Sequence, residues 1–240
     1  MKKELARTIE YKAFEFRKMC SIEMDEPVNI KQTLRKLNVL TLYRPLADNF
    51  SGMCLKNQTH KFVLVNSAHP RGRQHFTIAH EFYHLFIQKD FEVHPCNPGV
   101  NKEPQEQEAD CFASALLMPE MGIRKLIPEE ELGGKVSLST VLKLEQYFLV
   151  SRSAMLVRLS ALSFLSPERF EELRNTPVIR SALEYGYSDL SLYRPGNAGL
   201  FIGDYGDKAK KLFDSEKISE GHYLHLLSKI GIDLTNDNHE

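Results

Sequence analysis

The stretch FTIAHEFYHLFIQ, residues 76–88, places two histidines four residues apart, with a glutamate directly after the first. In an α-helix, which advances about 100° per residue, His80 and His84 lie one turn apart on the same face, so both imidazoles can bind a single metal ion. Glu81 lies beside that face, where its carboxylate can take a proton from a water molecule on the metal without binding the metal itself. These three side chains predict a metal site suited to hydrolysis.

This spacing is the HExxH pattern of zinc peptidases, although short patterns also arise by chance and their surroundings must decide. Here the surroundings are apolar on nearly every side, as in a helix buried within a core. The residues that show this are Phe76, Ile78, Ala79, Phe82, Leu85, Phe86 and Ile87. We expect the helix to span about residues 70–88, with Pro70 in its first turn and Asn66 or Ser67 as its cap.

A third ligand is expected from EPQEQEADCFASALLMPE, residues 103–120, where Pro104 starts a second helix and Pro119 ends it. With Glu106 at zero on a helical wheel, Asp110 lies at about 40° and Glu108 at about 200°. The small apolar residues within about 80° of Glu106 are Ala109, Ala113, Leu116 and Leu117. We therefore predict that Glu106 is the third zinc ligand and that Asp110 accepts a hydrogen bond from a ligating histidine.

The two stretches FTIAHEFYHLFI and EQEADCFASALLMPE together resemble the ImmA/IrrE family of metallo-endopeptidases, which look like members of the gluzincin group. The family pattern is Arg-x-Phe-Thr-x-Ala-His-Glu-x-x-His and then Glu-x-x-Ala-Asp/Asn-x-Phe-Ala-x-x-Leu-Leu-Met-Pro. This chain differs in having two residues, Gln74 and His75, between its arginine and phenylalanine. The resemblance covers roughly residues 29–165. The resemblance implies that His80, His84 and Glu106 are the zinc ligands, in agreement with the helical-wheel argument, and that Glu81 is the catalytic base.

The composition describes an ordinary globular chain of 240 residues, 42% hydrophobic and 26% charged, with a net charge of −1. No strongly basic surface indicates nucleic acid, and no run approaches the length of a membrane span. The first twenty residues are interrupted by charge at every turn, so they lack the apolar core of a signal peptide. We expect a cytoplasmic protein whose four cysteines are free thiols.

Three short stretches before the HExxH motif, VLTLYRPL, SGMCLK and KFVLVN, are rich in strand-forming residues. Helices are expected at residues 4–17 and 30–37. The sequence thus predicts an α+β fold with a zincin-like core, made of a small antiparallel sheet and two ligand-bearing helices. We predict a metallopeptidase domain at residues 1–134, a helix-turn-helix-like pair at 135–166 and a helical C-terminal extension at 167–240 whose role the sequence does not indicate.

The helix pair is expected at about residues 139–147 and 151–162, around a turn at 148–150. Such a pair invites a DNA-binding hypothesis. Its positive charges are Lys143, Arg152 and Arg158, with Lys135 just before and Glu145 opposing, too few to neutralise a DNA backbone. We therefore favour a structural or partner-docking pair over direct DNA binding.

Other histidines offer weaker alternatives. His94 with Cys96, in the expected loop at residues 91–102, and His222 with His225, three apart on an expected helix, each lack a third ligand. A loop and an ordinary histidine pair are the favoured interpretations. The group that stabilises the oxyanion stays open among four residues, because nothing in the sequence ranks them. They are Tyr83, Arg73, His94 and Tyr147.

The function that we predict is zinc-dependent endopeptidase activity. Family members typically act on a helix-turn-helix repressor or antitoxin encoded beside them, so the resemblance implies such a partner and control of stress-response or mobile-element genes. The strand at residues 61–66 is expected to be the sheet edge that holds an extended substrate, and Val63→Pro should remove an edge donor. The alternative is a non-cleaving, zinc-containing regulator that binds DNA or protein.

Overall fold

The computed structural model describes residues 3–89, 95–96 and 103–234. Its helices are α1 (Lys3–Met19), α2 (Ile30–Lys36), α3 (Arg71–Phe86), α4 (Pro104–Leu117), α5 (Glu120–Leu126), α6 (Leu138–Phe148), α7 (Arg152–Ala161), α8 (Pro167–Arg174), α9 (Val178–Glu184), α10 (Tyr205–Asp214) and α11 (Glu220–Lys229), with short 3-10 turns η1 (Glu129–Glu131) and η2 (Ser191–Tyr193). Its strands are β1 (Val39–Arg44), β2 (Gly52–Lys56), β3 (Lys61–Asn66), β4 (Pro95–Cys96) and β5 (Phe201–Ile202). None of the described helices is long and apolar enough to cross a membrane.

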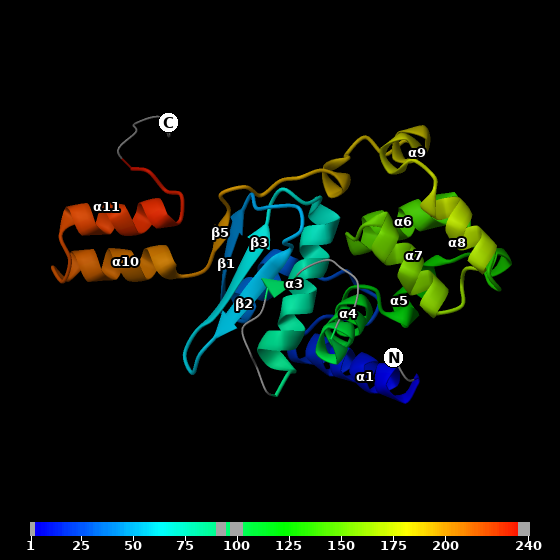
Figure 1. Ribbon diagram of the computed structural model, residues 1–240, viewed down its shortest axis with the longest axis horizontal. Coiled ribbons are helices and arrows are strands. Elements are labelled where there is room, and N and C mark those ends of the chain that lie inside the picture. The colour runs from blue at the N-terminus through cyan, green and yellow to red at the C-terminus, as the bar shows by residue number, and fades with distance from the viewer. Residues whose placement is uncertain (1–2, 90–94, 97–102, 235–240) are drawn as a thin grey trace.

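The sheet has the strand order β4-β2-β3-β1-β5 (Figure 1). The α+β class is confirmed, and three of the four strand pairs run antiparallel as expected; the exception is β1 with β3, which run parallel and make the sheet mixed. The reason lies in residues 45–51, which begin with Pro45 and carry the chain past the position of β3. The chain then returns through β2 into β3, so neighbours in sequence do not all become neighbours in the sheet.

Strand β3 lies in the middle of the sheet and pairs with β1 on one side and β2 on the other. The prediction that residues 61–66 form a substrate-binding edge is therefore wrong. Val63 is fully buried and pairs with Thr41 and Cys54, so Val63→Pro would disrupt the core ladder rather than an edge. Among the described strands, β2 and β1 each lie one strand from an edge of the sheet, β2 beside the two residues of β4 and β1 beside the two residues of β5.

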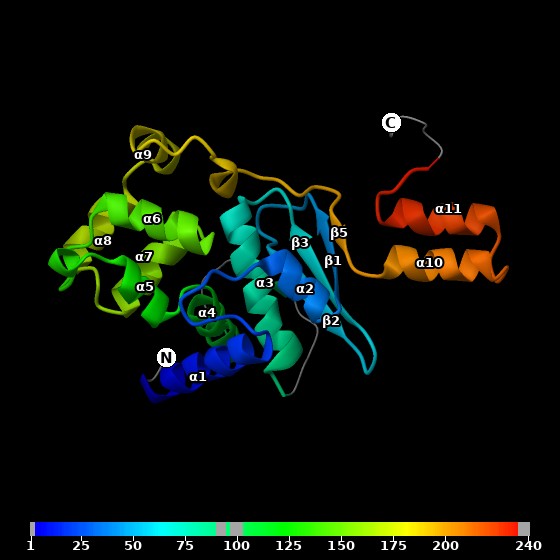
Figure 2. The ribbon, with the colours of Figure 1, turned by 180° about the vertical axis from the view of Figure 1, so that it is seen from behind.

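Helices α2 and α3 cover one face of the sheet, and α1 and α4 pack behind α3 (Figure 2). Phe16 of α1 joins this layer together, with its ring centroid 5.4 Å from that of Phe82, 5.6 Å from that of Phe86 and 5.6 Å from that of Phe112. Phe82 and Phe112 are fully buried, and α3 is thereby enclosed by the sheet, α1 and α4. This enclosure explains why the HExxH helix is apolar on nearly every side.

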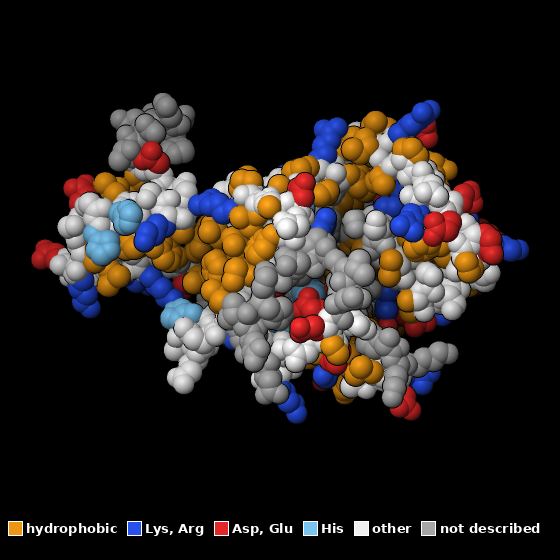
Figure 3. All heavy atoms as spheres, in the orientation of Figure 1, with side chains coloured by type: hydrophobic (Ala, Val, Ile, Leu, Met, Phe, Trp, Pro, Cys, Tyr) orange, Lys and Arg blue, Asp and Glu red, His pale blue; other side chains and the backbone are white. Residues whose placement is uncertain are grey.

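The other face of the sheet is apolar as well, which is why the strands do not alternate cleanly between apolar and polar residues. Strand register places these apolar residues on it: Leu40, Leu42, Met53, Leu55, Phe62, Leu64 and Phe201. All but the exposed Leu55 are half-buried. Figure 3 shows hydrophobic side chains gathered over this part of the molecule.

Helices α6 and α7 form the predicted pair, with the intervening turn at residues 149–151. Leu149 ends α6 in the left-handed conformation at φ 56°, and Ser151 caps α7 by accepting a hydrogen bond from Ala154 N. The two arginines of α7, counted among the few positive charges of the pair, are buried in ion pairs, Arg152 with Glu145 and Arg158 with Glu10. Both arginine charges are therefore paired with glutamates of this chain rather than presented to DNA.

The predicted C-terminal extension is only partly helical and returns to the sheet. Figure 1 shows it leaving α9, crossing above α3 and entering β5, beyond which α10 and α11 form a hairpin beside the sheet. β5 pairs with Thr41 and Leu42 of β1. The extension therefore supplies one strand to the sheet against which α3 packs.

Candidate metal centre

The two histidines lie on the buried core of α3, and both are 1% exposed. Their Nε2 atoms are 3.1 Å apart and their ring centroids 4.9 Å apart, as expected for residues one helical turn apart. α3 begins at Arg71 with Pro70 as its cap, and no side chain caps it. The expected Asn66 cap is wrong, because the Asn66 side chain instead binds the backbone of residues 46–50 and Ala68.

Helix α4 brings Glu106 against both rings. Pro104 starts this helix as predicted, and Glu106 lies in its first turn. Its carboxylate oxygens lie 3.3 Å from His80 Nε2 and 3.2 Å from His84 Nε2, and all three ligand atoms lie within 4.8 Å of one another. Glu108 faces elsewhere and accepts a hydrogen bond from the Tyr83 hydroxyl. In the described part of the chain, this is the one group of three or more such side chains that could hold a metal ion.

The Nδ1 atoms of His80 and His84, which point away from Glu106, have hydrogen-bond partners that suit both rings to binding a metal ion through Nε2. His80 Nδ1 lies 2.9 Å from Asp110 Oδ1, and His84 Nδ1 lies 2.6 Å from Gln88 Oε1. When each Nδ1 donates to an oxygen, each Nε2 keeps its lone pair for a metal. Two imidazoles and one carboxylate that leave a fourth position open form a donor set that catalytic zinc prefers.

Glu81 is 1% exposed and stands beside this group without joining it. Its Oε1 is buried and has no hydrogen-bond partner among the described residues. Burial raises the pKa of this carboxyl, while the neighbouring His80 and a hydrogen bond with Cys54 act in the opposite direction. A buried carboxylate with one oxygen unbonded is chemically suited to accept a proton.

Strand β2 lies directly against the same helix through its inward-facing residues. A Cβ on Gly52 would lie 2.6 Å from Thr77 Cγ2, 2.8 Å from Leu64 O and 3.7 Å from Glu81 Oε1, so only glycine permits this close approach. Two residues later Cys54 meets Glu81, and Lys56 reaches the far end of α3, where its Nζ lies 2.9 Å from the carbonyl oxygen of His84. Sequence reasoning missed these contacts, since they depend on how the strand docks.

Three of the four candidates for oxyanion stabilisation can be placed. The Tyr83 hydroxyl is bound to Glu108, and the Tyr147 hydroxyl donates to the carbonyl of Asp25, 3.0 Å away. Arg73 lies two turns before Glu81 on the face of α3 that meets the start of β2, and its Nη2 donates to Ser51 Oγ at 3.2 Å. His94, with the side chain of Cys96 and most of the predicted loop at residues 91–102, falls outside the described residues.

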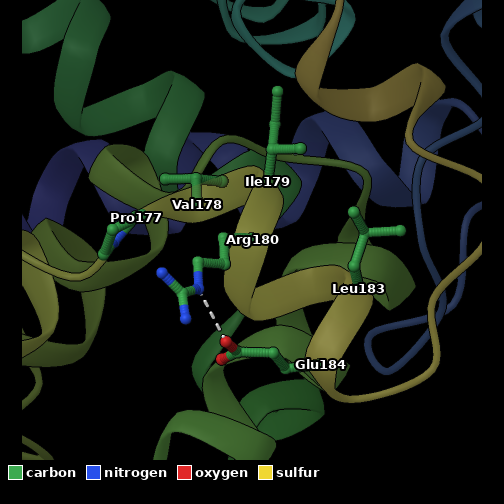
Figure 4. A pocket seen from close by; sticks show the side chains of 6 residues that line it. All are labelled: Pro177, Val178, Ile179, Arg180, Leu183 and Glu184. Carbon is green, nitrogen blue, oxygen red and sulfur yellow. Dashed lines mark hydrogen bonds and ion pairs between the residues drawn. The ribbon is translucent and has the colours of Figure 1, made fainter.

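An apolar surface pocket on α9 lies apart from this centre. Figure 4 shows Val178, Ile179 and Leu183 beside the Arg180–Glu184 ion pair, whose Nε and Oε1 are 2.8 Å apart. None of the predicted ligands lines it. The three predicted ligands lie instead on α3 and α4, beside β2.

A buried HExxH helix, a second helix that supplies a glutamate and a small sheet beside them define a zincin-like metallopeptidase core. In a comparison with protein families, residues 34–160 match the IrrE N-terminal-like domain of the M78 peptidases. The chain belongs to this family, the ImmA/IrrE metallopeptidases. A comparison with curated proteins finds no match.

Proposed function

We propose that this protein is a zinc-dependent endopeptidase that cleaves a helix-turn-helix transcriptional repressor or antitoxin, and thereby controls stress-response or mobile-element genes. The proposal is carried by the convergence of His80 Nε2, His84 Nε2 and the Glu106 carboxylate. Beside them lies the buried Glu81, whose Oε1 has no hydrogen-bond partner among the described residues. Family membership supports the general class, a metallopeptidase. The metal identity and the substrate are the new elements of the proposal.

A divalent cation held by His80, His84 and Glu106 would supply Lewis-acid chemistry, lowering the pKa of a water molecule and polarising a peptide carbonyl. Glu81 accepts at its carboxylate the proton that the attacking water loses, and then donates it to the leaving nitrogen. Asp110 holds the His80 ring in place from α4. Burial of Glu81 favours its protonated form, which suits the second of these transfers.

An extended substrate needs main-chain partners, and a sheet edge provides them with little side-chain selectivity. We assign this role to β2, whose inward face meets Glu81, in place of β3. In the described strands, the ladder between β4 and β2 joins at Gly52 and Met53, the start of β2. Selectivity for one partner protein must then come from surfaces outside the cleft.

The test uses the wild-type chain and Glu81→Gln. Each is incubated with the helix-turn-helix regulator encoded beside its gene and, separately, with casein. We expect the wild type to cut the regulator at one segment and casein poorly, with cut sites read by mass spectrometry. Glu81→Gln should keep stoichiometric zinc and lose about 10²- to 10⁴-fold in rate, because the amide is nearly isosteric but cannot accept the proton. Equal, scattered cleavage of both proteins would contradict a dedicated partner. If no zinc-dependent cleavage occurs, the protein is a non-cleaving regulator.

A further inference from the structure

The Nδ1 atoms of the two ligand histidines make hydrogen bonds with chemically different groups. His80 Nδ1 faces the carboxylate of Asp110, whereas His84 Nδ1 faces the side-chain amide of Gln88. An ionised carboxylate can only accept a hydrogen bond, so it fixes the proton on Nδ1. An amide can accept through its oxygen or donate through its nitrogen. The orientation of the Gln88 amide therefore decides whether His84 Nδ1 donates or accepts in this hydrogen bond.

The surroundings of Gln88 select one orientation. Gln88 is 8% exposed and lies just after α3, one turn beyond His84. Its Nε2 donates to Gln105 Oε1 at 2.7 Å, from the first turn of α4, so its Oε1 is left facing His84 Nδ1. The backbone of Gln88 is also held, since its N–H donates to Tyr83 O at 2.9 Å and its carbonyl accepts from Lys56 Nζ at 3.4 Å.

We propose that Gln88 and Gln105 are positioning residues that hold His84 in its Nδ1–H tautomer, so that the Nε2 lone pair points to the metal position shared with His80 and Glu106. The inference deepens the proposed function and rests on it for the identity of the metal. With the amide reversed, His84 would carry its proton on Nε2, and metal binding would first require that proton to leave.

A neutral amide at His84 also keeps the local charge lower than a second carboxylate would. Asp110 and Glu106 already contribute two negative charges beside the rings, and Glu81 lies next to them. Gln88→Glu would retain an acceptor for His84 Nδ1 and add charge, whereas Gln88→Met would fill the same space with no acceptor. These two variants separate the hydrogen bond from simple packing.

The decisive measurement is the tautomer of His84 in the metal-free, full-length protein carrying Glu106→Ala, because the Glu106 carboxylate, 3.2 Å from His84 Nε2, would itself favour a proton on that nitrogen. The tautomer is read from ring ¹⁵N shifts by NMR and assigned with His84→Ala. In this background we expect Nδ1–H with Gln88 and with Gln88→Glu, and its loss with Gln88→Met. Zinc affinity, measured by chelator competition, should fall about 10- to 100-fold in Gln88→Met and stay at or above the wild-type value in Gln88→Glu. Gln32→Met is the control, because no hydrogen bond of the Gln32 side chain is found within the described chain.

Gln105→Met changes an exposed residue, so it tests the hydrogen bond from Gln88 to Gln105 even if Gln88→Met folds poorly. It should weaken zinc binding less than Gln88→Met does and give a mixture of His84 tautomers. An Nε2–H tautomer in the Glu106→Ala background with Gln88 intact, or unchanged tautomer and affinity in both methionine variants, would overturn the proposal. If the wild type binds no zinc, the proposed function fails, and the tautomer comparison still decides this inference.

Discussion

Glu106 and Glu108 are two residues apart on α4, yet only Glu106 contacts the ligand histidines. Glu106→Ala should strip the metal, because two imidazoles alone leave the ion under-coordinated. Glu108→Ala should retain the metal and lower the free energy of unfolding by about 1–3 kcal/mol, since the largely buried Tyr83 hydroxyl loses its acceptor. Metal content by mass spectrometry and urea unfolding distinguish the two effects. Loss of metal from Glu108→Ala alone would reverse the assignment.

Much of the site was predictable because it depends on helix geometry. The spacing of His80 and His84 and the wheel position of Glu106 are local properties that residue numbers determine. Asp110 could be placed for the same reason. Gln88 also lies four residues from His84 and could have been found by this rule, but a glutamine carries no metal-binding signal. Cys54 comes from a strand, and no local rule predicts which strand packs on a helix.

At the scale of elements, Lys56 links β2 to the C-terminal end of α3. Its ammonium lies 2.9 Å from His84 O, 3.2 Å from Leu85 O and 3.4 Å from Gln88 O, at the negative end of the helix dipole. Lys56→Met should lower the free energy of unfolding by about 1–3 kcal/mol, because charged hydrogen bonds are lost. Chemical denaturation measures this, with the exposed Lys143→Met as control. Equal effects of both variants would show that the contact contributes nothing specific.

The start of α3 docks on the turn between α6 and α7. A Cβ on Gly72 would lie 2.7 Å from Ser151 N, and His75 Nδ1 donates to the Leu149 carbonyl at 2.8 Å. Burial lowers the pKa of His75 below its ordinary 6.5, although the Leu149 bond acts in the opposite direction. The unfolded chain thus takes up the proton at higher pH than the folded chain. The stability from neutral His75 is complete above 6.5 and is lost as pH falls through the lowered pKa.

This linkage predicts how His75→Gln should behave. Its amide can still donate to Leu149 O but does not titrate, so the wild type should lose free energy of unfolding relative to the variant as the pH falls below 6.5. Urea unfolding at several pH values measures the difference. The exposed His222→Gln controls for removal of a histidine. A wild-type-to-His75→Gln difference that is constant with pH would contradict the assigned pKa direction.

The order of the elements was harder to predict than their existence. The helices before the site, the helix pair and the three central strands all occur close to their expected positions. The sheet order was not predictable, because β1 pairs with β3 and β5 rather than with the strand that follows it. Periodicity reports which residues are buried and is silent on which strands become neighbours. This is why the substrate edge was first assigned to β3.

At the scale of the whole molecule, the predicted boundary at residue 167 lies upstream of segments that complete the core. Gln74 is 1% exposed, and its Nε2 donates to Gly196 O at 3.0 Å while its Oε1 accepts from Asn197 Nδ2 at 2.9 Å. A chain ending at residue 166 would lose these bonds and β5, and should melt lower or aggregate. A chain ending at residue 203 should keep both and bind metal normally. Thermal unfolding and metal content test this pair, and equal behaviour would show that β5 is dispensable.

The pairing of Thr41 with Ile202 also constrains when this protein can finish folding during its synthesis. Chains grow at about 5–20 residues per second, so the HExxH helix exists for many seconds before the strand that completes its sheet. Contacts between such distant segments are slow to form. A nascent chain would therefore carry every predicted ligand while its sheet remained open at β1. Stalled nascent chains in which residue 202 is still inside the ribosome or has already emerged should differ in the protease resistance of α3, and the enzyme should become competent only once residue 202 has emerged.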